Sequence, residues 1–202
     1  MTDDFVMTDR RALIPLGLTL LRAALAPLLV YLAHYAPRPE WFAVCLVVAL
    51  LSDIFDGVIA RKLNVATPTL RRLDSVADSI FYVAAIYAVW VLQPQVILDH
   101  AAALTLLLAL EGARYAYDYW KFRREASYHM WSSKLWGLVL FLAFFSLLVF
   151  DNAGLWVSAA IWLGILADCE GLLISAVLPC WKNDVPTIFH ALRLRREMEQ
   201  GE

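Results

Sequence analysis

The sequence lacks an excess of basic residues: its 17 lysines and arginines are matched by 19 aspartates and glutamates, for a net charge of −2. Proteins that bind nucleic acid normally carry a basic surplus, so the composition argues against that class of partner. Cysteine is scarce too, and Cys45, Cys169 and Cys180 form neither a CxxC motif nor an obvious disulfide framework. The N-terminal segment has no clear small-residue cleavage site, which argues against a cleaved signal peptide.

Apolar residues are abundant: 61% of the chain is hydrophobic and the mean hydropathy is +0.63. Soluble domains are about half apolar or less, so the composition predicts an integral membrane protein. Six apolar runs have about the length needed to cross a bilayer. We therefore predict an all-α, six-transmembrane-helix bundle over residues 13–178, within a single domain of residues 1–202. The predicted spans are Leu13–Ala36, Trp41–Ala60, Leu70–Leu92, Val96–Tyr117, Trp131–Phe150 and Leu155–Leu178.

Basic residues gather in the segments on one side of these spans. They are Arg10, Arg11, Arg61, Lys62, Arg71, Arg72, Lys121, Arg123, Arg124, Lys182, Arg193, Arg195 and Arg196. The connections on the other side contain only Arg38. Because basic loops stay in the cytoplasm, we predict that both termini are cytoplasmic, and we expect the membrane to be a bacterial inner membrane.

Short flanking segments complete the predicted layout. Residues 1–12 are expected to lie along the membrane interface, and residues 182–202 to form a cytoplasmic tail. A helix is expected in the tail, with Asp184 as its N-cap and Pro186 in its first turn. Its apolar and basic residues suit a helix resting on anionic lipid, and a tail free in solution is the equal alternative.

Four aspartates lie inside the second and third spans, where charge is costly and usually serves a function. At about 100° per residue, the two acids of each span lie on one stripe of the helix surface. The stripes are Asp53, Asp56, Gly57 and Ala60 on one span and Leu70, Asp74 and Asp78 on the next. A short connection makes the two spans antiparallel neighbours. We therefore expect the four carboxylates to converge at one depth.

Such a cluster predicts a divalent metal site. Four ionised carboxylates cannot share a low-dielectric pocket without counter-charge. Oxygen ligands favour Mg²⁺ or Mn²⁺ and less readily Ca²⁺, and the absence of His and Cys from the cluster argues against zinc. Gly57 and Ala60 leave room for a phosphate ester beside the metal. The alternative is that the aspartates cap helix ends or pair with Arg61, Arg71 and Arg72.

The spacing of these residues resembles a known family signature. Asp53-x-x-Asp56-Gly57-x-x-Ala60-Arg61, eight residues, and Leu70-x-x-x-Asp74-x-x-x-Asp78 match seven of the eight specified positions of the CDP-alcohol phosphatidyltransferase motif. The departure is Leu70, where the family has glycine. The six-span layout and the segment T-L-L-R at residues 19–22 extend the likeness to the first span.

The resemblance implies an enzyme of phospholipid biosynthesis. Such enzymes transfer a phosphatidyl group from CDP-diacylglycerol to the hydroxyl of a small acceptor and release CMP; we expect glycerol 3-phosphate as the acceptor, as in a phosphatidylglycerophosphate synthase. By position, two ions of Mg²⁺ or Mn²⁺ are held by Asp53, Asp56 and Asp74, and Asp78 joins the metal shell and acts as general base. The nucleotide is bound beside Asp53, Asp56, Gly57, Ala60, Arg61 and Leu70. The resemblance also implies a homodimer in the lipid bilayer, with the active site on the cytoplasmic side.

Three further basic residues, Arg22, Arg114 and Lys134, lie within predicted spans. They either bind an anionic acceptor or snorkel or pair with Glu111 or Asp118. Structural pairing is expected for Asp168 and Glu170.

Two other functions remain open from the sequence. The first is a catalytically silent family member, because Leu70 replaces the family glycine. The second is a divalent-cation transporter, which predicts acidic residues along a path to the outer face. The third span has none beyond Asp78, which counts against transport.

Overall fold

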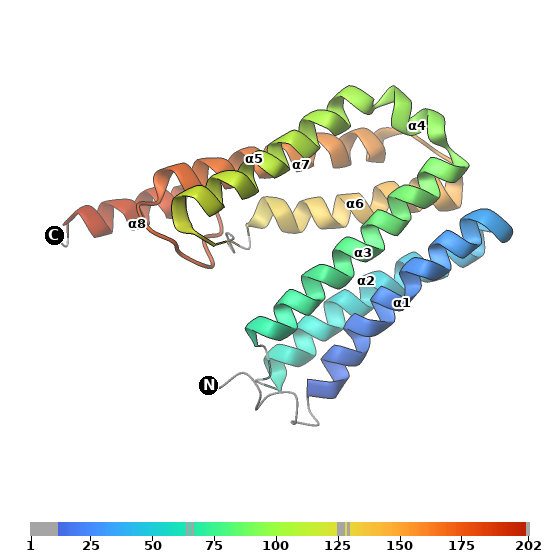
Figure 1. Ribbon diagram of the computed structural model, residues 1–202, viewed down its shortest axis with the longest axis horizontal. Coiled ribbons are helices and arrows are strands. Elements are labelled where there is room, and N and C mark those ends of the chain that lie inside the picture. Colours follow the sequence, from blue (N-terminus) through green and yellow to red (C-terminus); the bar gives the residue numbers. More distant parts are fainter. Residues whose placement is uncertain (1–11, 64, 66, 125–127, 129, 201–202) are drawn as a thin grey trace. The chain divides into compact units, whose positions relative to one another are not determined.

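The structure is a computed structural model that describes residues 12–200 except 64, 66, 125–127 and 129. The described residues form eight helices and no strand (Figure 1). The helices are α1 (Leu13–Tyr35), α2 (Pro39–Lys62), α3 (Pro68–Leu92), α4 (Pro94–Asp99), α5 (Ala101–Phe122), α6 (Trp131–Phe150), α7 (Leu155–Val177) and α8 (Ile188–Gln200). The all-α prediction is thus confirmed, whereas the interfacial segment predicted at residues 1–12 lies almost wholly outside the described residues.

Prolines set several helix boundaries. Pro39 and Pro68 stand in the first turns of α2 and α3, where proline's missing N–H costs nothing. Thr67 caps α3, because its hydroxyl accepts a hydrogen bond from the backbone N–H of Leu70 at 3.2 Å. Five of the six predicted spans agree with α1, α2, α3, α6 and α7 to within two residues at each end.

The fourth predicted span, Val96–Tyr117, is wrong in its bounds. The helix breaks at His100, which separates the short α4 from α5, and α5 continues to Phe122. Five of the described helices, α1, α2, α3, α6 and α7, are long and apolar enough to cross a membrane. The chain is therefore an integral membrane protein, but six spans are not confirmed. The physical reason is that α5 carries four charged residues, spaced three and four apart on one face: Glu111, Arg114, Asp118 and Lys121.

The chain forms two compact units, the first comprising residues 1–96 and 144–152. In this unit α1 packs against both α2 and α3, and the three helices lie side by side (Figure 1). Buried alanines allow this close approach; among them are Ala26, Ala33, Ala49, Ala84, Ala85 and Ala88. The end of α6 joins this unit through stacking of Tyr82 on Phe144 and a hydrogen bond from Gln93 Nε2 to the Leu147 carbonyl at 2.9 Å.

The second unit, residues 97–143 and 153–202, is held by a polar seam between α5 and α7. Arg114 Nη1 lies 2.9 Å from Asp168 Oδ1. One turn further along α5, Asp118 accepts a hydrogen bond from the Ser175 hydroxyl of α7, which also contacts the Tyr128 hydroxyl at 2.8 Å. Arg114 is thus ion-paired, and Asp118 and Lys121 form hydrogen bonds to α7, which explains how so polar a helix is accommodated. The structural pairing predicted for Asp168 is confirmed. Arg114 forms its ion pair with Asp168, and not with Glu111 or Asp118.

The C-terminal helix α8 begins later than expected. Its first residue is Ile188, and the hydroxyl of Thr187 lies 3.4 Å from the backbone N–H of His190, in the capping position. The prediction of Asp184 as N-cap is wrong, because that residue adopts a left-handed conformation with φ 55° before the helix starts. Glu170 of α7 accepts hydrogen bonds from the Ile188 N–H at 3.2 Å and from the Ser132 hydroxyl at 2.6 Å, which confirms a structural role for this carboxylate.

A glycine makes the α5–α7 seam possible, and its replacement tests the packing. A Cβ at Gly171 would lie 2.8 Å from Cδ of Arg114, so Gly171→Ala must displace this side chain from Asp168. We expect the variant to lose about 1–3 kcal/mol of unfolding free energy, measured by thermal or denaturant unfolding in detergent. Gly112→Ala on α5 is the control, because nothing lies within 4 Å of its added Cβ and alanine favours helix. Equal unfolding free energies of the two variants would contradict the close contact between Gly171 and Arg114.

Candidate metal centre

The four aspartates of the second and third spans converge inside the first unit. Asp53 and Asp56 lie on α2, and Asp74 and Asp78 lie on α3. Oxygen atoms of Asp53, Asp56 and Asp74 lie within 4.8 Å of one another. The convergence expected from the two helical stripes is therefore present in the structure.

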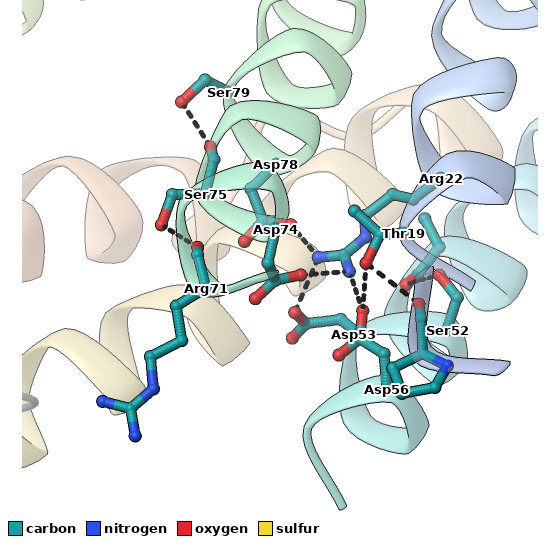
Figure 2. Close-up of polar contacts among 12 residues, drawn as sticks. Thr19, Arg22, Ser52, Asp53, Asp56, Arg71, Asp74, Ser75, Asp78 and Ser79 are labelled. Carbon is teal, nitrogen blue, oxygen red and sulfur yellow. Dashed lines mark hydrogen bonds and ion pairs between the residues drawn. The ribbon is translucent and has the colours of Figure 1, made fainter. Parts of the chain in front are cut away.

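A guanidinium from α1 lies at the centre of this cluster. Arg22 Nη1 is 2.7 Å from Asp53 Oδ1 and also contacts Asp78 Oδ1. Arg22 Nη2 is 2.7 Å from Asp74 Oδ1 and also contacts Asp56 Oδ2. Each terminal nitrogen thus joins one carboxylate of α2 to one of α3, and Figure 2 shows the side chain reaching between the two helices. In the described residues the four aspartates pair with Arg22, and not with Arg61, Arg71 or Arg72.

Burial differs from one side of the cluster to the other. Arg22 is 1% exposed and Asp56 is 4% exposed. The side chains of Asp53, Asp74 and Asp78 are 46%, 34% and 35% exposed. Thr19, one turn before Arg22, lies on the buried side, with its hydroxyl 3.4 Å from Asp56 Oδ2. The site therefore has a closed floor at Arg22, Thr19 and Asp56 and an accessible rim formed by the other three carboxylates.

The charge and donor chemistry of the cluster fit divalent ions. One guanidinium faces four carboxylates, so a large negative excess remains when all four are ionised. Excess negative charge in a low-dielectric region is costly, and bound cations are one way to neutralise it. Carboxylate oxygens alone form the acidic donor set of this cluster, which suits Mg²⁺ or Mn²⁺.

The other motif residues lie on the same two helices. Ala60 is buried, and Gly57 is partly buried with the guanidinium of Arg61 beside it, since a Cβ added there would lie 3.6 Å from Arg61 Nη1. Leu70 is half-buried in the first turn of α3, where its N–H donates to Thr67. Small residues and one arginine therefore follow the acidic stripe of α2 toward its C-terminal end.

The three basic residues considered for acceptor binding have different surroundings. Both terminal nitrogens of Arg22 contact the aspartates, as described above. Arg114 pairs with Asp168 in the second unit. Lys134, also in the second unit, has its ammonium 4.7 Å from the centre of the Trp131 ring.

The role of Arg22 as the cation of the aspartate cluster was missed by sequence reasoning. Its signal was present in T-L-L-R, residues 19–22, where a polar residue and an arginine three residues apart occupy one face of an apolar span. An arginine so placed is expected to face the protein interior and an acidic partner. The short connection between α2 and α3 predicts that these two helices are neighbours, but it carries no information about the position of α1.

These observations define an integral membrane protein in which four partly buried acids from two helices surround an arginine from a third. The chain belongs to the CDP-alcohol phosphatidyltransferase family, whose pattern it matches over residues 12–168, so the predicted family is confirmed. It is also similar to a CDP-diacylglycerol–glycerol-3-phosphate 3-phosphatidyltransferase of Wigglesworthia glossinidia brevipalpis, with 33% identity over 94 residues, 42% of this chain and 52% of the relative. The chain thus matches about half the length of this curated relative. No solved structure matches the chain.

Metal binding by the cluster is tested at its most buried carboxylate. Asp56→Asn removes one negative charge and one ligand oxygen, so we expect Mn²⁺ affinity to fall by at least about tenfold, measured by electron paramagnetic resonance of free Mn²⁺. Asp184→Asn is the control, because Asp184 is exposed outside this unit and asparagine tolerates its left-handed backbone. Unchanged Mn²⁺ binding in Asp56→Asn would count against a metal centre here.

Proposed function

We propose that this protein transfers the phosphatidyl group of CDP-diacylglycerol to the hydroxyl of glycerol 3-phosphate and releases CMP. The observation that supports this proposal is the convergence of all four motif aspartates in a member of the CDP-alcohol phosphatidyltransferase family. The choice of acceptor rests on the curated relative, whose name specifies glycerol 3-phosphate.

Asp53, Asp56 and Asp74 would hold the divalent ions, with Asp78 completing the acidic shell. When bound, Mg²⁺ or Mn²⁺ neutralises the diphosphate and stabilises CMP as a leaving group. The partly exposed rim suits this role, because phosphate oxygens must reach the ions from outside the helix bundle. Gly57 and Ala60 leave space beside the acids, and the neighbouring Arg61 supplies a positive charge for the nucleotide.

Asp78 is the proposed general base. Its side chain lies on the accessible rim, one helical turn beyond Asp74. In the reaction, the Asp78 carboxylate removes the proton from the acceptor hydroxyl as that oxygen attacks the phosphorus bearing the diacylglycerol. The bond between this phosphorus and the bridging oxygen breaks, and the electron pair leaves with CMP. Asp78 then returns the proton to solvent.

The cytoplasmic orientation is part of the same proposal. A diacylglycerol donor keeps its acyl chains in the bilayer, while its nucleotide approaches from the aqueous side. The motif aspartates lie toward the end of α2 and the start of α3, next to the basic residues Arg61, Lys62, Arg71 and Arg72. Basic residues beside a span favour the cytoplasmic face, where CDP-diacylglycerol and a soluble acceptor can meet.

A catalytically silent protein is the second candidate, and one observation favours it. Leu70 adds a branched side chain at the start of α3, where the family has glycine. The loss of this small residue would affect donor binding more directly than metal binding, since the four aspartates are all present.

Activity is tested directly with CDP-diacylglycerol and Mg²⁺ or Mn²⁺. CMP release is measured with glycerol 3-phosphate, serine and inositol phosphate as acceptors, and we expect release with glycerol 3-phosphate. Asp78→Asn should lower kcat by at least about 100-fold, because the amide cannot accept the proton. Asp184→Asn again serves as the control. No CMP release from folded wild-type protein with any acceptor would favour the silent protein.

Leu70→Gly tests the departure from the family motif. We expect this variant to retain or increase kcat/KM for CDP-diacylglycerol, because it restores space beside the nucleotide. Leu73→Gly is the matched control, because Leu73 lies one turn along α3 on an exposed face and its replacement costs the helix about as much. A large activity loss confined to Leu70→Gly would show that Leu70 forms part of the donor site.

A further inference from the structure

We propose that Arg22 is a resident cation that occupies the aspartate cluster when divalent ions are absent and is displaced when they bind. This inference rests on the proposed function, because it requires that the cluster takes divalent metal. It assigns Arg22 a role different from that of an acceptor ligand. The role is a positioning one: Arg22 acts on the carboxylates and not on the substrate.

The contacts of the guanidinium support competition with a metal ion. Nη2 bridges Asp56 and Asp74, and Nη1 reaches Asp53; these are the three residues whose oxygens are close enough to share an ion. An ion bound by these carboxylates at about 2.1 Å would lie within a few ångströms of the guanidinium. Two cations at that separation repel strongly where the dielectric constant is low.

The surroundings of Arg22 indicate that it substitutes for an ion. A single fork of nitrogens contacts four carboxylates from two helices, which is the arrangement that a bridging metal would otherwise provide. Its Nε is buried and has no hydrogen-bond partner in the described part of the chain. A buried donor without a partner is costly, so the contacts of Nη1 and Nη2 with the aspartates must offset the cost of burying this guanidinium. Once ions neutralise the acids, little holds the guanidinium in place.

Without such a cation, the metal-free protein would face strong repulsion. Four carboxylates would crowd together beneath the membrane surface, with α2 and α3 forced apart. Arg22 removes part of this repulsion and keeps the acids together until ions arrive. The three partly exposed carboxylates on the rim give ions a route to the cluster from outside.

The experiment uses Arg22→Met, which keeps much of the length of the side chain and removes its charge. Wild type and variant are purified in Mn²⁺, and thermal unfolding is followed before and after chelation. We expect chelation to destabilise Arg22→Met far more than wild type, with recovery on returning Mn²⁺. We also expect the variant to bind Mn²⁺ at least about tenfold more tightly, because a competing cation is gone.

Two further variants make the result decisive. Arg72→Met removes a positive charge from an exposed position on α3 and should leave Mn²⁺ affinity close to that of wild type. Arg22→Lys keeps the charge but has one nitrogen in place of the fork, so we expect Mn²⁺ affinity between those of wild type and Arg22→Met. The lysine variant also gives an answer where the methionine variant fails to fold.

Weaker or unchanged Mn²⁺ binding in both Arg22 variants would overturn the inference, because Arg22 would then support the metal site or be indifferent to it. These measurements need no turnover. Absence of CMP release would therefore refute the proposed transferase activity without affecting the conclusion about Arg22, and the converse also holds.

Discussion

The three-helix unit of this protein depends on the meeting of one guanidinium with four carboxylates inside an apolar bundle. Burying a charge in such surroundings costs several kcal/mol unless a partner compensates for it. Arg22 comes from α1, and its partners come in pairs from α2 and α3, so the interaction requires all three helices to be in place. The small residues between the helices allow this approach, because backbones separated by alanine can lie close together.

The second unit buries charge in a different way. Arg114 meets one carboxylate, Asp168, and Asp118 is satisfied by the hydroxyl of Ser175. Each of these two carboxylates contacts one cation or one hydroxyl donor, which is the usual solution for polar residues that stabilise a fold. In the first unit, four acids share one base. This imbalance distinguishes the aspartate cluster from a structural ion pair and supports the proposal that it binds divalent cations.

The two units also show why hydropathy alone assigns some helices well and others poorly. For α1, α2, α3, α6 and α7, long apolar runs bounded by Pro or Gly turns predict helix limits closely. For α5, charged residues recur on one face, and mean hydropathy falls although Arg114, Asp118 and Lys121 bond to α7 inside the protein. The start of α8 was missed for a local reason, because Thr187 and not Asp184 provides the cap.

The sequence by itself determined the membrane class, the family and the convergence of the four aspartates. These follow from composition and from helical periodicity, which places residues three and four apart on one face whatever surrounds the helix. Only the tertiary structure decided which cation meets those aspartates. Arg22 lies more than thirty residues before Asp53, and periodicity within one helix carries no information about which face of another helix packs against it. Arg22 meets the aspartates because α1 packs against both of the helices that carry them.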